Sequence, residues 1–274
     1  GTILFSAGED GCIVGWDPEN CTRKIAFEGH TKPVKALDVD PLNRFLLSAA
    51  EDNVVMAWDI RNGKALKFFE PPAGNIDAVA ISPNGQFIVG GGWALTLWHV
   101  DTGRCLLAGE VDSGSILSLA WTPDSRHVIT ATSEELVQIW DMSQLKCVHV
   151  LQTGTGCVAS IKVSADGKFL MTGNRPLWGH QGRLMLWDMQ DLKPIFSEEA
   201  HRGGINTVSL SVNARIGLTG GQDNTVRLWD FQDRACLQVL SETTPNVRAV
   251  VLSPECRFAA AADEHGNIEI WYLD

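Results

Sequence analysis

The sequence lacks a long apolar run and an N-terminal leader. No apolar stretch approaches the roughly 18–20 residues of a membrane-spanning helix, so we expect no membrane span. No basic segment followed by an apolar one opens the chain, as it would in a secretory leader. The sequence starts at Gly1 rather than at a methionine, so we expect the natural start to lie upstream.

An excess of positive charge is also missing. Lys and Arg number 22 and Asp and Glu 33, which gives a formal net charge of −11. A nucleic-acid-binding protein needs a basic face that displaces the counterions of the phosphates. The charge balance therefore predicts no nucleic-acid partner.

The seven cysteines are odd in number and scattered, and none stands in a Cys-x-x-Cys pair. Structural zinc sites usually use closely spaced pairs, so we expect no metal and no other cofactor. We interpret the cysteines as small buried side chains of a protein in a reducing compartment. This predicts an intracellular protein, without a choice between cytoplasm and nucleus.

Tryptophan, in contrast, recurs at a nearly constant interval. Successive members of the series lie 42, 40, 42, 47, 42 and 42 residues apart, and Asp follows five of them. A period of about 40–45 residues with Trp-Asp is typical of propeller blades. The repeats end near Trp16, Trp58, Trp98, Trp140, Trp187, Trp229 and Trp271.

Each period contains short apolar runs separated by turn residues. In the second period the runs cover 34–39, 44–49, 54–58 and 64–69. Such runs are typical of strands, and none is long enough for an amphipathic helix. The sequence therefore predicts an all-β protein, a seven-bladed β-propeller of four-stranded antiparallel blades, with residues 1–274 as a single domain.

Over essentially the whole chain these repeats resemble the WD-repeat family. The resemblance implies a structural network in a blade, formed by a His before the inner strand, a Ser or Thr on the second strand, an Asp in the next turn and the Trp. Two blades contain all four residues at the same spacing, and the first blade retains three. The network residues are His30, Ser48, Asp52 and Trp58; His201, Thr219, Asp223 and Trp229; and Ser6, Asp10 and Trp16.

A Ser, a His and an Asp in one blade also resemble a catalytic triad. The set recurs in phase with the strands, whereas a nucleophile would be unique and exposed, so we expect buried structural hydrogen bonds. Enzymes built on other propellers need a convergent group of acids, Arg or metal ligands, and the sequence shows none outside the repeat phase. We therefore predict no catalytic residue and no enzyme activity.

The first repeat lacks an inner strand and the last lacks an outer one. In the WD-repeat family a segment near the N-terminus supplies both strands and clasps the ring. The resemblance therefore implies about 20–30 residues upstream, the length of two strands and their turns. Three alternatives stay open: an upstream segment that is not seen, a trimmed chain, or a clasp from elsewhere in a longer protein.

The connections between strands fall into two classes that differ in charge. We call top loops those from an outer strand to the next inner strand and from a second strand to the Trp strand; the other two kinds are bottom turns. The top loops hold most of the unbalanced acidic residues, and Glu9, Glu51 and Glu264 share one repeat position. We expect these three to bind a protein partner with a basic segment; the alternative is a face that only promotes solubility.

Two further top loops depart from the repeat. The fifth repeat has an enlarged loop with Arg175, Trp178 and His180, and the third has a shortened one with Trp93. Trp and Arg are frequent interface anchors, so these four residues are additional candidates for partner binding. The alternative for Trp178 is that it folds back over the propeller.

Residues 46–61 also resemble the Trp-Asp-x-Arg box, which ends here in Trp58, Asp59 and Arg61. In some WD-repeat proteins this box docks an adaptor of cullin-based ubiquitin ligases. We predict a protein-interaction scaffold or recognition module, within a longer chain or a larger complex. The alternatives are a substrate receptor of a ubiquitin ligase and, from another class, a propeller enzyme.

Overall fold

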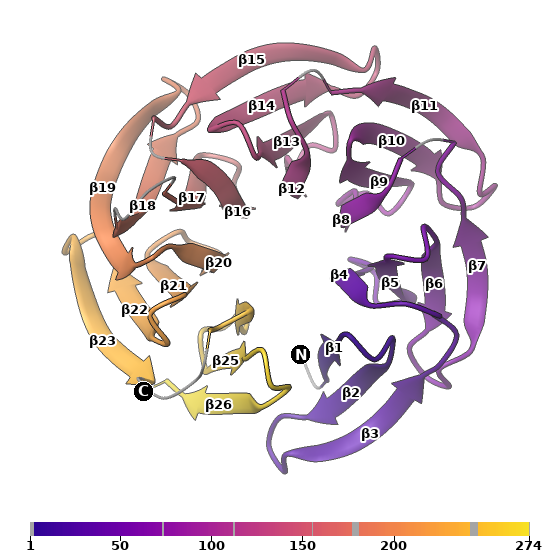
Figure 1. Cartoon of the computed structure of the whole chain (residues 1–274), viewed down its shortest axis with the longest axis horizontal. Coiled ribbons are helices and arrows are strands. Elements are labelled where there is room, and N and C mark those ends of the chain that lie inside the picture. Colours follow the sequence, from indigo (N-terminus) through magenta and orange to yellow (C-terminus); the bar gives the residue numbers. More distant parts are fainter. Residues whose placement is uncertain are drawn as a thin grey trace. The chain divides into compact units, whose positions relative to one another are not determined.

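The computed structural model describes residues 3–72, 74–111, 113–154, 156–176, 181–241 and 246–273. These residues form 26 β-strands and contain no helix (Figure 1). Accordingly, this described part holds no helix that is long and apolar enough to cross a membrane.

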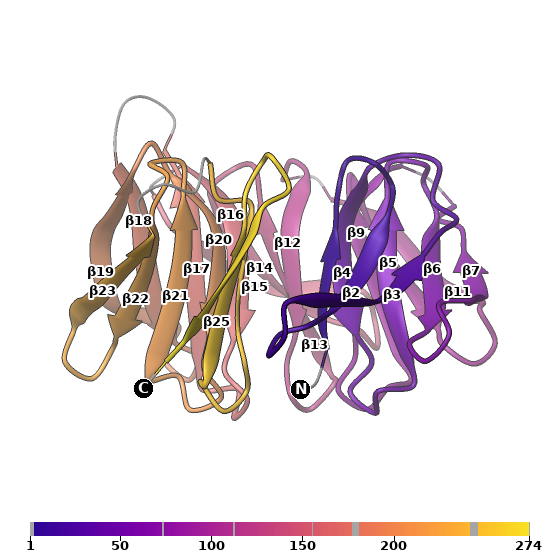
Figure 2. The same cartoon turned by 90° about the horizontal axis from the view of Figure 1, so that it is seen from below.

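The strands form seven sheets, each built from strands that are consecutive in the chain (Figure 1). The protein is a seven-bladed β-propeller, as the sequence predicted. Among the described residues five blades have four strands, while the first and the last have three. Figure 2 shows the sheets from the side, with the strand connections at their upper and lower ends.

We number the sheets one to seven in the order in which their strands follow one another in the chain. They contain β1 (Leu4–Ala7), β2 (Ile13–Asp17) and β3 (Thr22–Phe27); β4 (Val34–Val39), β5 (Phe45–Ala50), β6 (Val55–Asp59) and β7 (Ala65–Phe69); β8 (Ile76–Ile81), β9 (Phe87–Gly92), β10 (Ala94–His99) and β11 (Cys105–Glu110); β12 (Ile116–Trp121), β13 (His127–Thr132), β14 (Leu136–Asp141) and β15 (Lys146–Gln152); β16 (Cys157–Val163), β17 (Phe169–Arg175), β18 (Gln181–Asp188) and β19 (Lys193–Arg202); β20 (Ile205–Leu210), β21 (Ile216–Gly221), β22 (Val226–Asp230) and β23 (Ala235–Ser241); and β24 (Ala249–Leu252), β25 (Phe258–Ala262) and β26 (Ile268–Tyr272).

Sheet two shows how the sequence specifies a blade. All residues of β5 and β6 are buried, which explains why these strands are continuous apolar runs. In the turn before β5, the Asp40 carboxylate accepts the backbone N–H groups of Leu42 and Arg44 at 3.2 and 3.0 Å. Asn43 in the same turn takes the left-handed conformation, with a φ of 53°. The predicted runs differ from the observed strands by no more than one residue at either end.

The strands group into two compact units. The first contains residues 1–130 and 139–149, and the second contains residues 131–138 and 150–274. Each unit has its own apolar core, built from the buried strands of its sheets.

Within each unit, aromatic rings join neighbouring sheets. Phe27 on the outer strand of sheet one contacts Trp58 of sheet two edge-on, with ring centroids 5.9 Å apart. Phe196 on the outer strand of sheet five contacts Trp229 of sheet six in the same way at 6.3 Å. The repeating Trp is therefore a packing residue that receives the outer strand of the preceding sheet.

Inner strands of neighbouring sheets are joined by hydrogen bonds. In the first unit, the Asp38 carboxylate on β4 accepts the N–H of Ile81 on β8 at 2.8 Å. In the second unit, the Ser209 hydroxyl on β20 accepts the N–H of Leu252 on β24 at 3.0 Å. Short polar side chains on inner strands thus satisfy backbone donors that face an adjacent sheet.

The prediction of buried cysteines is wrong. All seven are free thiols, four of them exposed and three half-buried. Cys105, Cys147 and Cys236 lie on β11, β15 and β23, outer strands whose side chains are mostly exposed. Because an outer strand ends its sheet, fewer neighbours cover it.

Candidate functional site

The network predicted in sheet two connects four side chains below the top loops. The Trp58 indole Nε1 donates to Ser48 Oγ at 2.8 Å. His30 lies between Ser48 and Asp52, with Nε2 2.6 Å from the hydroxyl and Nδ1 2.9 Å from the carboxylate. Since an ionised carboxylate only accepts, Nδ1 donates to Asp52, and the Ser48 hydroxyl joins the indole to the imidazole. Every polar group is paired, which suits a structural role.

Sheet six repeats this arrangement. The Trp229 indole Nε1 donates to Thr219 Oγ1 at 2.9 Å. His201 Nε2 lies 2.7 Å from the same hydroxyl, and Nδ1 lies 2.8 Å from Asp223. His201 is fully buried, and Thr225 Oγ1 also lies 3.0 Å from its Nδ1.

The titrating groups of sheet six are strongly perturbed. Burial lowers the pKa of His201, although its hydrogen bond to Asp223 acts in the opposite direction. Burial by itself raises the pKa of Asp223, but the hydrogen bond and charge of His201 outweigh it and hold the pKa far below its usual range. The carboxylate also accepts the Thr225 hydroxyl at 2.7 Å and pairs with Arg227 at 3.3 Å. No described Lys or Arg pairs with Asp52 in this way.

Other sheets retain part of the network. In the first sheet the Asp10 carboxylate is exposed and accepts the N–H of Cys12 at 2.9 Å. The sequence did not reveal Thr172, because the enlarged loop places it 15 residues before its Trp instead of 10. The indole N–H donates to the hydroxyl of the second strand in three more sheets: Trp16 to Ser6 at 2.8 Å, Trp140 to Thr130 at 3.0 Å and Trp187 to Thr172 at 3.1 Å.

The three glutamates predicted to bind a partner differ in their surroundings. In the first unit, Glu51 forms an ion pair with Lys35, whereas Glu9 is exposed and has no ion pair with a described residue. In the second unit, Glu264 lies 3.4 Å from Arg248. Two of the three charges are therefore partly balanced by cations that the sequence reasoning did not count.

Asp77 on β8 is a further carboxylate of the first unit, and the sequence reasoning missed it. Burial raises its pKa, and the negative charge of Glu51 adds to the shift while Lys35 opposes it. The Asn75 amide donates to its Oδ2 at 2.6 Å, and the Ser115 hydroxyl lies 3.5 Å from the same atom. A half-buried carboxylate beside a second carboxylate is an arrangement that a bound cation would stabilise.

Trp93 lies close to Asp77 in the fold. It stands between β9 and β10 and is 62% exposed. Its neighbour Gly92 pairs with Ile76, which directly precedes Asp77. Residues 77 and 93 therefore lie near each other along the backbone at the top end of sheet three.

Of the three candidate residues in the enlarged loop of the fifth repeat, the structure describes only Arg175. Trp178 and His180 lie outside the described residues. Arg175 is the last residue of β17 and is half-buried, not a freely exposed loop residue. Burial lowers the pKa of its guanidinium, with a contribution from the charge of Arg248, and its buried Nε has no hydrogen-bond partner among the described residues.

The residues of the Trp-Asp-x-Arg box are not equally accessible. Trp58 is fully buried and Asp59 is 6% exposed. The Arg61 side chain is 83% exposed, although its Nε lies 3.1 Å from Asp59. The hydrogen bond from Arg61 lowers the pKa of Asp59.

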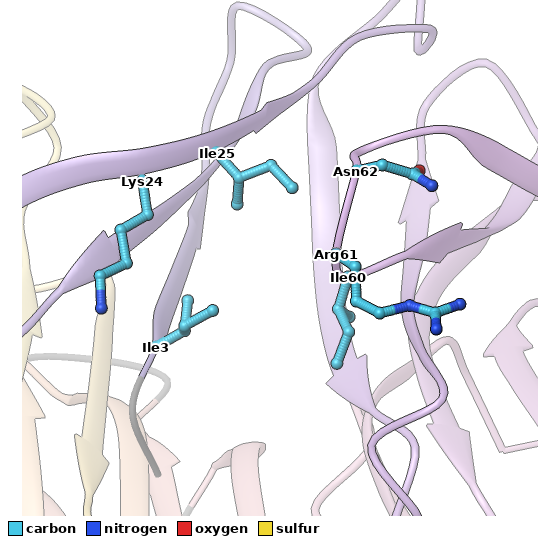
Figure 3. Close-up of a pocket in the computed structure, with 6 residues that line it drawn as sticks. All are labelled: Ile3, Lys24, Ile25, Ile60, Arg61 and Asn62. Carbon is cyan, nitrogen blue, oxygen red and sulfur yellow. The ribbon is translucent and has the colours of Figure 1, made fainter.

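Arg61 borders a pocket between sheets one and two. The pocket has a volume of about 420 Å³ and is lined by Ile3, Lys24, Ile25, Ile60, Arg61 and Asn62. Figure 3 shows Ile25 and Ile60 on opposite sides of it, while the Arg61 guanidinium points away from Ile25. The interior is therefore aliphatic and the cations lie at its border.

The repeat, the blades and the Trp–hydroxyl bonds agree with one protein family. A profile described as the first β-propeller of IFT122 matches residues 1–272. The chain belongs to this family. It is a WD-repeat propeller, as the resemblance implied.

The individual relatives share about a quarter of the aligned residues with this chain, and each is much longer than the segment that it matches. The chain is similar to autophagy-related protein 16 of Arabidopsis thaliana, with 25% identity over 65% of this chain and 35% of the relative. It is similar to the APC/C activator protein CDC20 of Saccharomyces cerevisiae, with 27% identity over 58% of this chain and 25% of the relative. It is also similar to the LST8 homologue of Drosophila melanogaster, with 26% identity over 67% of this chain and 58% of the relative. The chain thus spans between a quarter and somewhat over half of these relatives.

The partner of Glu51 that the sequence reasoning missed, Lys35, depends on the register of two strands. In the antiparallel pair β4–β5, Val34 pairs with Ala50 and Ala36 pairs with Ala49, so Lys35 is the extra residue of a β-bulge. Its ammonium forms an ion pair with Glu51, the residue after β5. Such a pair becomes visible only once the register and its bulge are assigned. Metal ligation has no comparable signal: the described part of the chain contains no group of three or more His, Cys, Asp or Glu that could hold a metal ion.

Proposed function

We propose that the chain is a protein-interaction module whose top loops in the first unit bind a partner segment rich in Lys or Arg. The observation that carries this proposal is the group formed by Glu51, Asp77 and Trp93. The pKa of Asp77 is raised because the carboxyl is buried, which outweighs the opposing hydrogen bonds and the charge of Lys35; Glu51 adds a smaller contribution, and Trp93 is exposed in the connection between β9 and β10. One relative is named as an activator of APC/C, and we propose that this chain likewise works within a protein assembly.

A cationic side chain would be stabilised at this group in two ways. Its charge would favour the ionised form of Asp77, which burial disfavours. Its ammonium or guanidinium would also lie near the face of Trp93, where the ring quadrupole attracts cations. The formal net charge of −11 would steer such a segment during its approach.

The proposal is tested by selection of short random peptides on the intact chain. We expect enrichment of Lys- and Arg-rich sequences whose association slows as the salt concentration rises past about 0.15 M, where the screening length is ~8 Å. The double variant Glu51→Gln, Asp77→Asn should weaken binding several-fold. The matched control is Glu19→Gln, at an exposed bottom-turn residue. Peptides without basic residues, or equal binding by both variants, would contradict the proposal.

A second function, as a substrate receptor of a cullin-based ubiquitin ligase, is supported by one observation. Arg61 keeps 83% of its side chain exposed, beside the pocket of Figure 3. Co-purification of the ligase adaptor from cell extract should be lost in Arg61→Ala and retained in Arg23→Ala, a matched exposed cation. Retention in both variants, or no adaptor with the unmodified chain, would exclude this function.

We further propose that the protein is not an enzyme, binds no nucleic acid and works inside the cell. The paired network of sheet two supports the first point, because its hydroxyl and imidazole are already bonded. The acidic charge supports the second. Retention of the chain on immobilised DNA at physiological salt would contradict that point, and fluorescence imaging of the tagged full-length protein tests its location.

A further inference from the structure

One repeat position lies between neighbouring sheets at their bottom turns. It is the ninth residue after the Trp, on the outer strand, and it faces the second residue after the Trp of the following sheet. Lys67 occupies it between sheets two and three, where Nζ donates to the backbone oxygen of Val100 at 2.8 Å. Phe196 occupies it between sheets five and six, where its ring lies 5.2 Å from that of Phe231. In both cases a long or aromatic side chain closes the gap.

The same position is left open twice in the first unit. Between sheets one and two the facing residues are Ile25 and Ile60, and the pocket of about 420 Å³ remains (Figure 3). Between sheets three and four they are Leu107 and Met142, and a cavity of about 560 Å³ remains. These aliphatic side chains do not span the space that Lys67 spans. Both volumes fall in the range of small binding pockets.

The larger cavity has a rigid apolar wall. Phe87 and Trp121, which line it, stack with ring centroids 6.5 Å apart and planes inclined by 27°. Leu107 and Met142 complete the apolar lining, and Leu106 beside them is 45% exposed. An apolar group that entered this cavity would therefore be covered on several sides and would also bury Leu106.

The cavity is lined by a cation that has no ion pair with a described residue. Arg126 lines it and is exposed, and its guanidinium has no ion pair with any residue in the described part of the chain. Asp141 also lines it, but its carboxylate already accepts the N–H and the hydroxyl of Ser143 at 2.8 and 2.6 Å. Arg126 acts on the pKa of Asp124 by its charge but pairs with no carboxylate among the described residues, so its guanidinium is available to a negative group of a partner.

The smaller pocket offers less to a ligand. Its two cations are already paired, Lys24 with Asp17 at 3.0 Å and Arg61 with Asp59 at 3.1 Å. A carboxylate that bound there would have to compete with these partners.

We propose that the cavity between sheets three and four binds a short segment of a protein partner in which an aromatic side chain stands next to a carboxylate. The aromatic ring takes the place that Phe196 takes between sheets five and six, against Phe87 and Trp121. The carboxylate pairs with Arg126. This surface lies at the bottom turns and selects the opposite charge from the top loops, so it goes beyond the function proposed above.

Selection of short random peptides on the intact chain tests this site. We expect one enriched class with Phe, Tyr or Trp beside Asp or Glu, and the most enriched member is then synthesised and titrated by calorimetry. Leu107→Phe places in the cavity the aromatic residue that sheet five has, and it should abolish binding. Leu106→Asp changes an exposed side chain and should weaken binding several-fold by repulsion, so the test does not depend on a core variant that fails to fold.

The matched control for the charge is a pair of arginines at one turn position. Arg126→Glu should weaken the acidic–aromatic peptide several-fold, while Arg257→Glu, in the corresponding turn of the last repeat, should leave its affinity unchanged. Asp77→Asn should also leave it unchanged, which separates this site from the top loops. The proposal is overturned if no acidic–aromatic class is enriched, or if Leu107→Phe with an unchanged melting temperature still binds the peptide.

Discussion

The ring of Trp98 lies against Gly90 so closely that a Cβ at residue 90 would come within 2.8 Å of the ring carbon Cζ3. In sheet two the corresponding residue is Ser48, whose hydroxyl accepts the Trp58 indole N–H. Trp98 Nε1 is buried and finds no acceptor among the described residues. The third repeat thus replaces a hydrogen bond by close packing of the indole on a glycine.

We expect Gly90→Ser to lower the free energy of unfolding, although it restores the residue type of sheet two. One hydrogen bond contributes about 1 kcal/mol net, whereas an extra atom forced into a packed core costs about 1–3 kcal/mol. Denaturant unfolding measures the difference. A gain in stability would show that the Trp98 ring moves aside and that the missing acceptor matters more than the packing.

The carboxylates of the two complete networks should differ in their effect. Asp52→Ala and Asp223→Ala should each lower the free energy of unfolding by about 1–3 kcal/mol, because they leave buried donors unpaired. The loss should be larger for Asp223, which also holds Thr225 and Arg227. His265→Ala, at an exposed residue of the last repeat, is the control and should stay within about 0.5 kcal/mol. Equal losses at all three positions would disprove the structural role of the networks.

The buried imidazole of sheet six should make stability depend on pH. The pKa of His201 is lowered from 6.5 by burial, so below pH 6.5 the unfolded chain binds the proton more readily than the folded one. This contribution to stability is present above pH 6.5 and is lost as the pH falls towards the lowered pKa. The lowered pKa of Asp223 acts in the same direction at more acidic pH. His201→Gln should flatten the dependence of the free energy of unfolding on pH just below pH 6.5, as measured in unfolding curves at several pH values. An unchanged dependence would show that other groups cause it.

The repeat made most of the fold predictable, because the Trp spacing and turn residues recur with one period. The strands of sheet two follow from apolar runs that neighbours cover on both faces. The network hydroxyls follow from phase alone, except Thr172, which the enlarged loop displaces. Local signals of this kind survive in a single sequence.

The charge partners were less predictable, because they depend on contacts between strands and sheets. Lys35 lies in a predicted strand, and only the β-bulge between Val34 and Ala36 and the ion pair it forms reveal its contact with Glu51. The raised pKa of Asp77 depends on burial, which no residue near it in the sequence reveals. The prediction that the cysteines are buried is wrong for a related reason, since composition does not distinguish the exposed side of an outer strand from a buried one.

Asp77 tests the proposed top-loop site, because its effect on stability should have the opposite sign from that of Asp52. Burial raises the pKa of Asp77 above its ordinary value of 3.8, so the folded chain disfavours the ionised form and loses stability as the pH rises above that value. We therefore expect Asp77→Asn to raise the free energy of unfolding at pH 7 and to have little effect below pH 3.8, where both states are protonated. The Asn amide oxygen can still accept the Asn75 hydrogen bond.

Asp52→Asn is the matched control for this last measurement. The pKa of Asp52 is lowered, because the hydrogen bonds from Thr31 and His30 outweigh the effect of its burial, so its removal should decrease stability at neutral pH. A carboxylate that lowers stability is understandable where it serves binding, since activity and stability often conflict at binding sites. Asp77→Asn should accordingly stabilise the chain and weaken the Lys- or Arg-rich peptide together. If the variant is instead less stable at pH 7, Asp77 is a structural residue, and the main support for a basic partner at the top loops is lost.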